Sequence, residues 1–153
     1  MGKEPIETLA RAIHERWRVE QRRSGEAAPP DWAELDESRQ NSSRDQAGDI
    51  VRKLQRIGCS VAPLSAMAPI DFRFTDEEVD LLGVEEHRRW VRERLANGWT
   101  PGPKDPARKT TPYLVSFSEL PPDIAEYDRM YIREIPNLLA AAGLRVVRDA
   151  GER

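Results

Sequence analysis

The stretch His14-Glu15-Arg16-Trp17 occurs a second time, in similar form, as His87-Arg88-Arg89-Trp90. Each copy lies in a segment whose apolar residues recur at helical spacing. A spacing of three residues places the His and the Trp of each copy on one helical face. Two similar helices would therefore present their tryptophans as the two walls of one slot, and we predict that this slot is the functional centre of the molecule.

The two stretches belong to a longer internal repeat. The helices that carry them align at a shift of 73 positions (14 to 87), and the helices that follow align at a shift of 85 positions (58 to 143). The aligned pairs are Leu9 with Leu82, His14 with His87, Trp17 with Trp90, Gly25 with Gly98, Trp32 with Phe117, Arg44 with Arg129, Ile50 with Ile135, Leu54 with Leu139, Gly58 with Gly143 and Val61 with Val146. The difference between the two shifts, 85 minus 73, places an insertion of 12 residues in the second copy.

The repeat predicts a mainly α fold of two helix-loop-helix copies, related by a pseudo-twofold axis and packed as one four-helix-like domain. The first copy is predicted over residues 4–61 and lacks the insertion. A connector is predicted over 62–75. The second copy is predicted over 76–147, with an arm over 99–117 that forms a loop or a short hairpin. Residues 148–153 are predicted to be a disordered tail.

Periodicity and capping signals predict the helices of both copies at residues 6–24, 38–57, 76–97 and 121–143. Each of these segments is closed by a glycine, which is typical of a helix C-terminus. Thr75 has the position of a capping-box residue before the third helix. The residues after 143 are predicted to form a short strand or an extended tail.

Composition limits the classes of function. The chain has 153 residues, a third of them charged, and a formal net charge of −3, which argues against non-specific nucleic-acid binding. No apolar run is long enough to span a membrane. Cys59 is the only cysteine, so an intramolecular disulfide is excluded and the cytoplasm is the predicted compartment. No nucleophile–base pattern or glycine-rich phosphate loop indicates an enzyme, and two histidines without further ligands do not indicate a metal site. We expect no cofactor.

The second copy resembles the ryanodine receptor repeat (RyR) domain. The residues that carry the resemblance are His87, Trp90, Gly98, Trp99, Thr100, Gly102, Pro103, Asp105, Lys109, Pro112, Leu114, Val115, Phe117, Leu120 and Pro121. The first copy retains the His-x-x-Trp motif and the second helix but lacks the Gly-Trp arm. The second copy departs from the family pattern at Pro101, where an aromatic residue is usual, at Thr111, where His is frequent, and at Asp128, which replaces Asn.

The resemblance implies a non-enzymatic module that binds a small ligand. In the receptors, two paired repeats together resemble a small-ligand site, in which an adenine nucleotide lies between the two tryptophans. Similar bacterial domains occur with systems that make or sense nucleotide- or NAD-derived signals. We therefore expect a sensor module for such a ligand. The alternative is a protein–protein adaptor that uses the paired helices and the arm as its surface, and neither a membrane nor a nucleic acid is expected as a partner.

The candidate ligand-binding residues are Trp17, Trp90, His14, His87, Glu86, Arg16 and Arg89, with Trp99, Lys104 and Tyr113 on the arm as secondary candidates. Each has a structural alternative. The tryptophans could fill the core, the histidines could be structural, and the arginines could solvate a helix face. Glu86 takes the place of Ile13 in the repeat. Its carboxylate therefore either needs a partner, such as a neighbouring arginine or a ligand hydroxyl, or is solvated.

Overall fold

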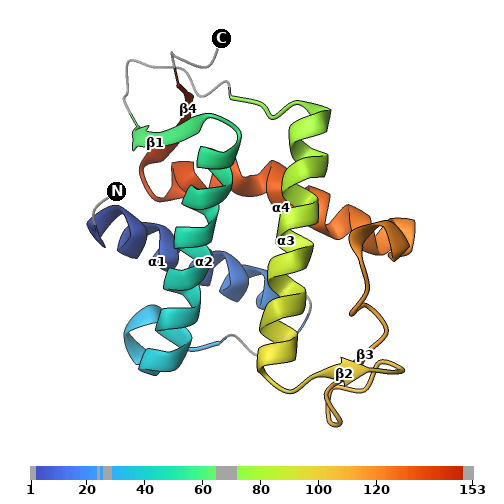
Figure 1. Cartoon of the computed structure of the whole chain (residues 1–153). Coiled ribbons are helices and arrows are strands. Elements are labelled where there is room, and N and C mark those ends of the chain that lie inside the picture. The colour runs from blue at the N-terminus through green and yellow to red at the C-terminus, as the bar shows by residue number, and fades with distance from the viewer. Residues whose placement is uncertain (1–2, 24, 26–28, 65–71, 150–153) are drawn as a thin grey trace. The chain divides into compact units, whose positions relative to one another are not determined.

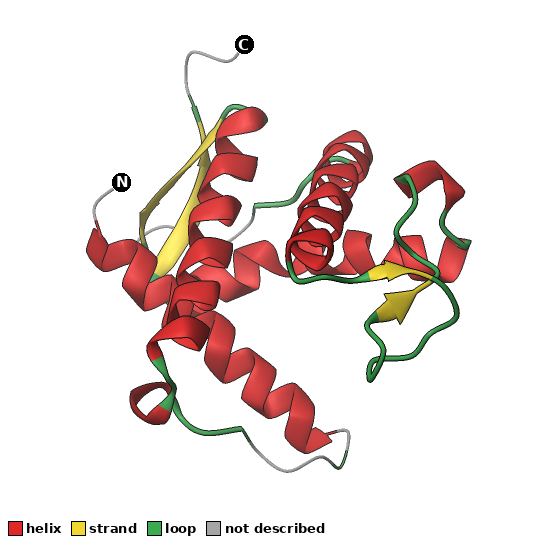
Figure 2. Ribbon diagram, turned by 60° about the horizontal axis from the view of Figure 1, so that its bottom comes forward, coloured by secondary structure: helices red, strands yellow, loops and turns green. Residues whose placement is uncertain are grey.

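The computed structural model describes residues 3–23, 25, 29–64 and 72–149 and shows a mainly α-helical chain (Figures 1 and 2). Its helices are α1 (Lys3–Arg23), α2 (Glu37–Arg56), α3 (Asp76–Ala96) and α4 (Pro122–Ala141). Its short elements are the 3-10 turns η1 (Trp32–Glu34) and η2 (Phe117–Glu119) and the strands β1 (Cys59–Pro63), β2 (Thr100–Pro101), β3 (Thr110–Thr111) and β4 (Leu144–Arg148). The chain divides into two compact units, one of residues 1–73 with 135–153 and one of residues 74–134.

The predicted helices are confirmed, with small differences at their ends, because local signals set those ends. Asp36 caps α2 by accepting a hydrogen bond from the Arg39 N–H at 2.8 Å. Thr75 and Glu78 form the predicted capping box at the start of α3, with hydrogen bonds of 3.1 and 2.8 Å. No helix in the described ranges is both long enough and apolar enough to cross a membrane.

Two equivalent glycines turn the chain from a helix into a strand. Gly58 follows α2 with a φ of 75°, and Gly143 follows α4 with a φ of 74°. These are left-handed conformations, which glycine adopts without the steric cost that other residues bear. The strands β1 and β4 begin directly after these two glycines.

Strands β1 and β4 form an antiparallel pair with a symmetric register (Figure 1). Val61 pairs with Val146, which is its own equivalent in the repeat. The shift of 85 positions also maps the outer pair Cys59–Arg148 onto the outer pair at the other end of the ladder. A local twofold axis therefore passes between Val61 and Val146. The connector predicted over 62–75 begins within β1, and the predicted tail begins within β4; residues 150–153 of that tail lie outside the described residues.

Apolar side chains at equivalent positions of the two copies form the cores. The buried residues of the first unit include Leu9, Ala10, Ile50, Leu54, Cys59, Ile135, Leu139 and Val146. Those of the second unit include Val79, Leu82, Leu120, Ala125 and Ile132. Lys53 is also buried, and its ammonium group pairs with Asp49 one turn earlier on α2. A buried charge of this kind requires such a partner.

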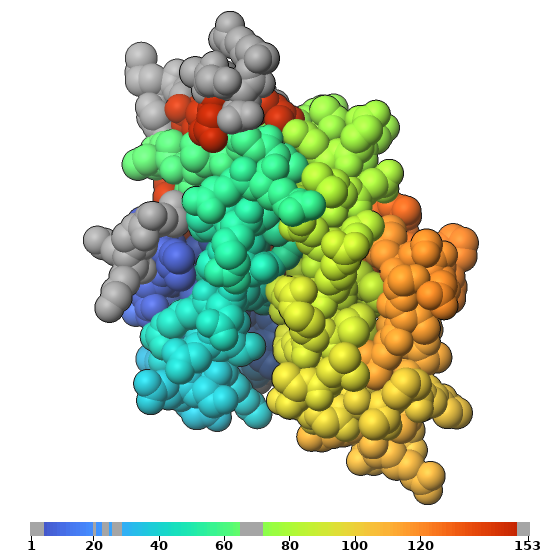
Figure 3. Space-filling model, in the orientation of Figure 1, coloured from blue at the N-terminus to red at the C-terminus, as the bar shows by residue number. Residues whose placement is uncertain are grey.

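The arm of the second copy begins at the C-terminal end of α3 and lies at the surface (Figure 3). Strands β2 and β3 pair in parallel, so the arm is a wound loop rather than the antiparallel hairpin that was one of the two predicted forms. Lys109 has a φ of 57°, and its ammonium group donates a hydrogen bond of 3.0 Å to the Asn97 carbonyl oxygen. This contact holds the arm against the end of α3.

Candidate functional site

The two motif histidines are buried and make the same contact in both copies. His14 Nε2 lies 2.7 Å from the Pro30 carbonyl oxygen, and His87 Nε2 lies 2.7 Å from the Val115 carbonyl oxygen. Each imidazole therefore donates from Nε2 and ties its loop to the motif helix. His87 Nδ1 also lies 3.8 Å from an Asp128 carboxylate oxygen. These contacts give both histidines a structural role, and the described ranges contain no cluster of His, Cys, Asp and Glu that could hold a metal.

The two motif tryptophans differ in exposure. Trp17 is 45 % exposed, and its ring centroid lies 5.7 Å from that of His14. Trp90 is half-buried and is stacked on His87, at 5.7 Å between centroids and 17° between planes. The tryptophans belong to different units, and the predicted slot between them stays a prediction.

The arm adds a cover to Trp90. The Arg94 guanidinium lies 5.2 Å from the Trp90 ring centroid and 4.9 Å from the Trp99 ring centroid. A cation placed against two aromatic rings is attracted to both. Trp99, one of the secondary candidates, therefore acts within the second unit by holding this cation beside Trp90. The first copy lacks this arm in its sequence, and its tryptophan is more exposed.

A second aromatic ring lies beside each histidine, supplied by the 3-10 turn of the same copy. The ring centroids of His14 and Trp32 are 6.1 Å apart, and those of His87 and Phe117 are 6.2 Å apart. Both pairs of ring planes meet at 60°. Trp32 and Phe117 are equivalent in the repeat, so the structure confirms that alignment at the level of side-chain packing.

An arginine covers each of these second rings and is held by a carboxylate. The Arg44 guanidinium lies 5.4 Å from the indole centroid, and its Nε lies 2.7 Å from Glu7. The Arg129 guanidinium lies 5.3 Å from the phenyl centroid, and its Nε lies 2.8 Å from Asp80. The hydrogen bond from Arg44 lowers the pKa of Glu7. The repeat alignment paired the two arginines but not the carboxylates, although Glu7 and Asp80 are also 73 positions apart.

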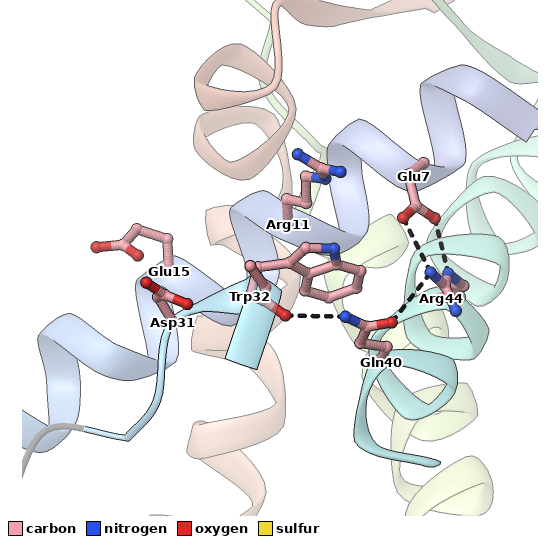
Figure 4. A pocket seen from close by; sticks show the side chains of 8 residues that line it. Glu7, Arg11, Glu15, Asp31, Trp32, Gln40 and Arg44 are labelled. Atoms are coloured by element: carbon pink, nitrogen blue, oxygen red, sulfur yellow. Dashed lines mark hydrogen bonds and ion pairs between the residues drawn. The ribbon is translucent and has the colours of Figure 1, made fainter. Parts of the chain in front are cut away.

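These groups of the first copy line an open groove of about 600 Å3 between α1, η1 and α2 (Figure 4). Trp32 lies in the groove with Arg11 on its α1 side and Arg44 on its α2 side. Gln40 donates a hydrogen bond of 2.8 Å to the Trp32 carbonyl oxygen. Glu15 and Asp31 lie at one end of the groove, and Glu7 and Arg44 lie at the other end.

The buried carboxylate of Glu86 is paired with Arg89. Two hydrogen bonds of 2.9 and 2.7 Å join the guanidinium to the two carboxylate oxygens. Arg89 also donates to Glu93 at 2.8 Å. The hydrogen bond with Glu86 raises the pKa of Arg89 well above its ordinary value. The alternative that Glu86 is solvated is wrong, because Glu86 is 7 % exposed.

Arg16 lines a smaller groove in the first unit, between α1 and the C-terminal part of α4. Its volume is about 360 Å3, and Glu15, Val19 and Asn137 also line it. An exposed guanidinium at the rim of a groove can bind phosphate or carboxylate oxygens in a forked geometry. The groove thus gives Arg16 a setting that suits its predicted role.

The two remaining arm candidates have less specific surroundings. Lys104 is exposed and has neither a hydrogen bond nor an ion pair with any described residue. Tyr113 is half-buried, and its backbone N–H donates to the Thr111 hydroxyl at 3.3 Å. The hydrogen bond of Tyr113 does not bring it to the motif of its own copy.

A comparison with protein families matches residues 73–148 to the RyR domain. The predicted resemblance of the second copy is thereby confirmed. The equivalence of the first copy to the second rests on the matched histidine, ring and ion-pair contacts described above. A search of curated proteins finds no match to the chain.

Proposed function

Residues 73–148 form an RyR domain, and from this premise we propose that the chain is a non-enzymatic binding module for a small ligand. The proposed ligand is an adenine nucleotide or a signal derived from NAD or another nucleotide. It stacks on the exposed tryptophan of the first His-x-x-Trp motif, Trp17. The observation that carries the proposal is the exposure of Trp17, since 45 % of this large residue faces solvent although its motif partner His14 is buried.

A half-exposed indole is a suitable platform for a base. Stacking of a nucleobase on an aromatic side chain contributes about 1–3 kcal/mol by alanine substitution. The buried His14 fixes the helix that carries Trp17 against its loop, so the ring is presented by a rigid element. Such preorganisation reduces the entropy lost on binding. Arg16, which lines the neighbouring groove, supplies the cation for a phosphate group in this proposal.

The proposal is tested by thermal unfolding of the purified chain with AMP, ADP, ATP, NAD and ADP-ribose. A ligand at one hundred times its Kd stabilises a protein by about 2.7 kcal/mol, which raises the Tm of a chain of this size by roughly 5–10 °C. Trp17→Ala should abolish that increase and leave the fold intact. Tyr127→Ala, which removes a more exposed ring on α4, is the matched control and should keep the increase.

Three results would contradict the proposal. One is a flat response of the wild-type chain to every compound. Another is an equal increase in Tm for wild type and Trp17→Ala. The third is chemical conversion of the ligand, detected by chromatography after incubation, because a binding module returns its ligand unchanged.

A further inference from the structure

A second open groove lies in the second unit, between α3 and the segment that leads into η2. Its volume is about 610 Å3. Its apolar wall is formed by half-buried side chains from both segments, namely Val84, Val91, Leu114 and Phe117. Two exposed arginines of α3, Arg88 and Arg92, line the same groove. The groove therefore combines an apolar surface with cationic groups.

This groove is the repeat equivalent of the groove around Trp32, but its charge is different. Arg88 stands at the position of Glu15, and Ser116 stands at the position of Asp31. The groove of the first copy is lined by three carboxylates and two guanidinium groups, whereas that of the second is lined by two guanidinium groups and no carboxylate. One scaffold thus carries two grooves of opposite charge, and the second favours an anion.

The guanidinium N–H groups of the two arginines can donate hydrogen bonds to a bound ligand. Neither Arg88 nor Arg92 has a hydrogen bond or an ion pair within the described part of the chain. They are four residues apart on α3, so their β-carbons are about 5–6 Å apart on one edge of the helix. Glu119, which does not line the groove, accepts a hydrogen bond of 2.7 Å from the hydroxyl of the lining residue Ser116.

The main-chain N–H groups on the other side of the groove also lack partners among the described residues. The N–H groups of Leu114, Val115 and Ser116 have no hydrogen-bond partner in the described residues. An extended peptide can pair with such groups. Its side chains at positions i and i+2 lie on one face, about 6–7 Å apart, which is close to the spacing of the two arginines. A stacked base is a poorer fit, because Arg129 and His87 already contact the Phe117 ring.

We propose that this groove binds an extended acidic peptide of a partner protein. An apolar side chain of the peptide packs against Val84, Val91 and Phe117. Two carboxylates pair with Arg88 and Arg92, and the peptide main chain pairs with the segment from Leu114 to Ser116. This site lies in the second copy and does not depend on the ligand proposed for Trp17.

The specificity is tested by selecting phage-displayed random heptapeptides on the immobilised full chain. The selected sequences should combine an apolar residue with two acidic residues at alternate positions. They should be lost when the same library is selected on the double variant Arg88→Glu/Arg92→Glu. Selection of peptides without acidic residues, equal retention on the double variant, or no enrichment at all would overturn the proposal.

The affinity is tested by fluorescence anisotropy with one selected peptide. Arg88→Glu and Arg92→Glu should each weaken binding by about ten-fold or more, since each removes a charge-assisted hydrogen bond. Lys104→Glu is the matched control, because it makes the same change of charge at an exposed arm residue and should leave binding within about two-fold. An equal loss in Lys104→Glu would show a non-specific charge effect and would overturn the proposal. Circular dichroism of each variant verifies that the fold is retained.

Discussion

The ion pair between Glu86 and Arg89 gives a test in which the two partners should behave differently. The Glu86 side chain is 9 % exposed and accepts two hydrogen bonds from Arg89, at 2.9 and 2.7 Å. The Arg89 side chain is 23 % exposed and has a second carboxylate, Glu93, at 2.8 Å. Removal of the Arg89 guanidinium therefore takes two hydrogen bonds from a carboxylate that water reaches poorly, whereas removal of the Glu86 carboxylate leaves a more exposed guanidinium that keeps its ion pair with Glu93.

The magnitudes follow from this asymmetry. Arg89→Met should lower the free energy of unfolding by about 3 kcal/mol, the lower end of the range for breaking a buried pair, because the site is not fully buried. Glu86→Gln keeps an acceptor and should cost only about 1 kcal/mol. The double variant Glu86→Ile/Arg89→Met places at position 86 the residue type of Ile13 and removes both charges. It should be more stable than Arg89→Met alone, since an apolar replacement of a buried pair is often nearly neutral.

The assay is urea denaturation followed by far-UV circular dichroism, with the free energy extrapolated to water. A pH series adds an independent readout. In Arg89→Met, burial should raise the pKa of the Glu86 carboxyl above its unfolded value. A group of this kind destabilises the fold while it is charged, so the deficit relative to wild type should shrink as the pH falls from 7 to 5. The reasoning is refuted if Arg89→Met costs no more than Glu86→Gln, or if the double variant is no better than Arg89→Met.

Two further predictions use the same denaturation assay. The hydrogen bond from Arg44 depresses the pKa of Glu7 below its ordinary value of 4.5, so its stabilisation is present above that value and is lost as the pH falls through the lower, folded-state pKa. Glu7→Gln should flatten the acid limb of the stability profile, and an unchanged limb would contradict the assignment. Gly58→Ala and Gly143→Ala should each cost about 1–2 kcal/mol because of their left-handed backbone. Gly48→Ala is their control: it lies inside α2, where the added methyl would meet only ordinary contacts, and should stabilise the chain by up to about 1 kcal/mol.

The helices and the repeat were predictable because their signals are local. Helical periodicity, capping residues and terminal glycines act within a few positions of one another, and each gives a pattern that recurs in the second copy. Strand β1 was not predictable in this way. Its five residues, Cys59–Pro63, include a proline, and they form a strand only because they pair with residues 81 to 89 positions further along the chain. Pairing over such a distance leaves no local signal.

Buried charges were the least predictable part of the candidate site. Lys53 is buried at the position that the apolar Leu138 has in the second copy, but within the amphipathic pattern of α2 a lysine by itself indicates a solvent-facing position. Its partner Asp49 is one turn away, as the partner of Glu86 is. In both cases the sequence contained the pair at helical spacing, but the same spacing occurs throughout solvated helix surfaces. Only the packing around the helix decides which pair is buried.

The two copies share the packing contacts around the motif histidine and differ in the charge of the groove that they present to solvent. The histidine that bonds a loop carbonyl, the ring beside it and the arginine that covers the ring have matching geometries in both copies, within about 0.1 Å for the ring distances. The groove beside these contacts reverses its charge at the position of Glu15 and Arg88. A side chain that only solvates a helix can have a positive or a negative charge in either copy, so solvation alone does not require this reversal. An apolar wall beside two arginines that have no partner among the described residues in one copy, and a mixed-charge groove around an indole in the other, instead give a single repeated scaffold two different surfaces.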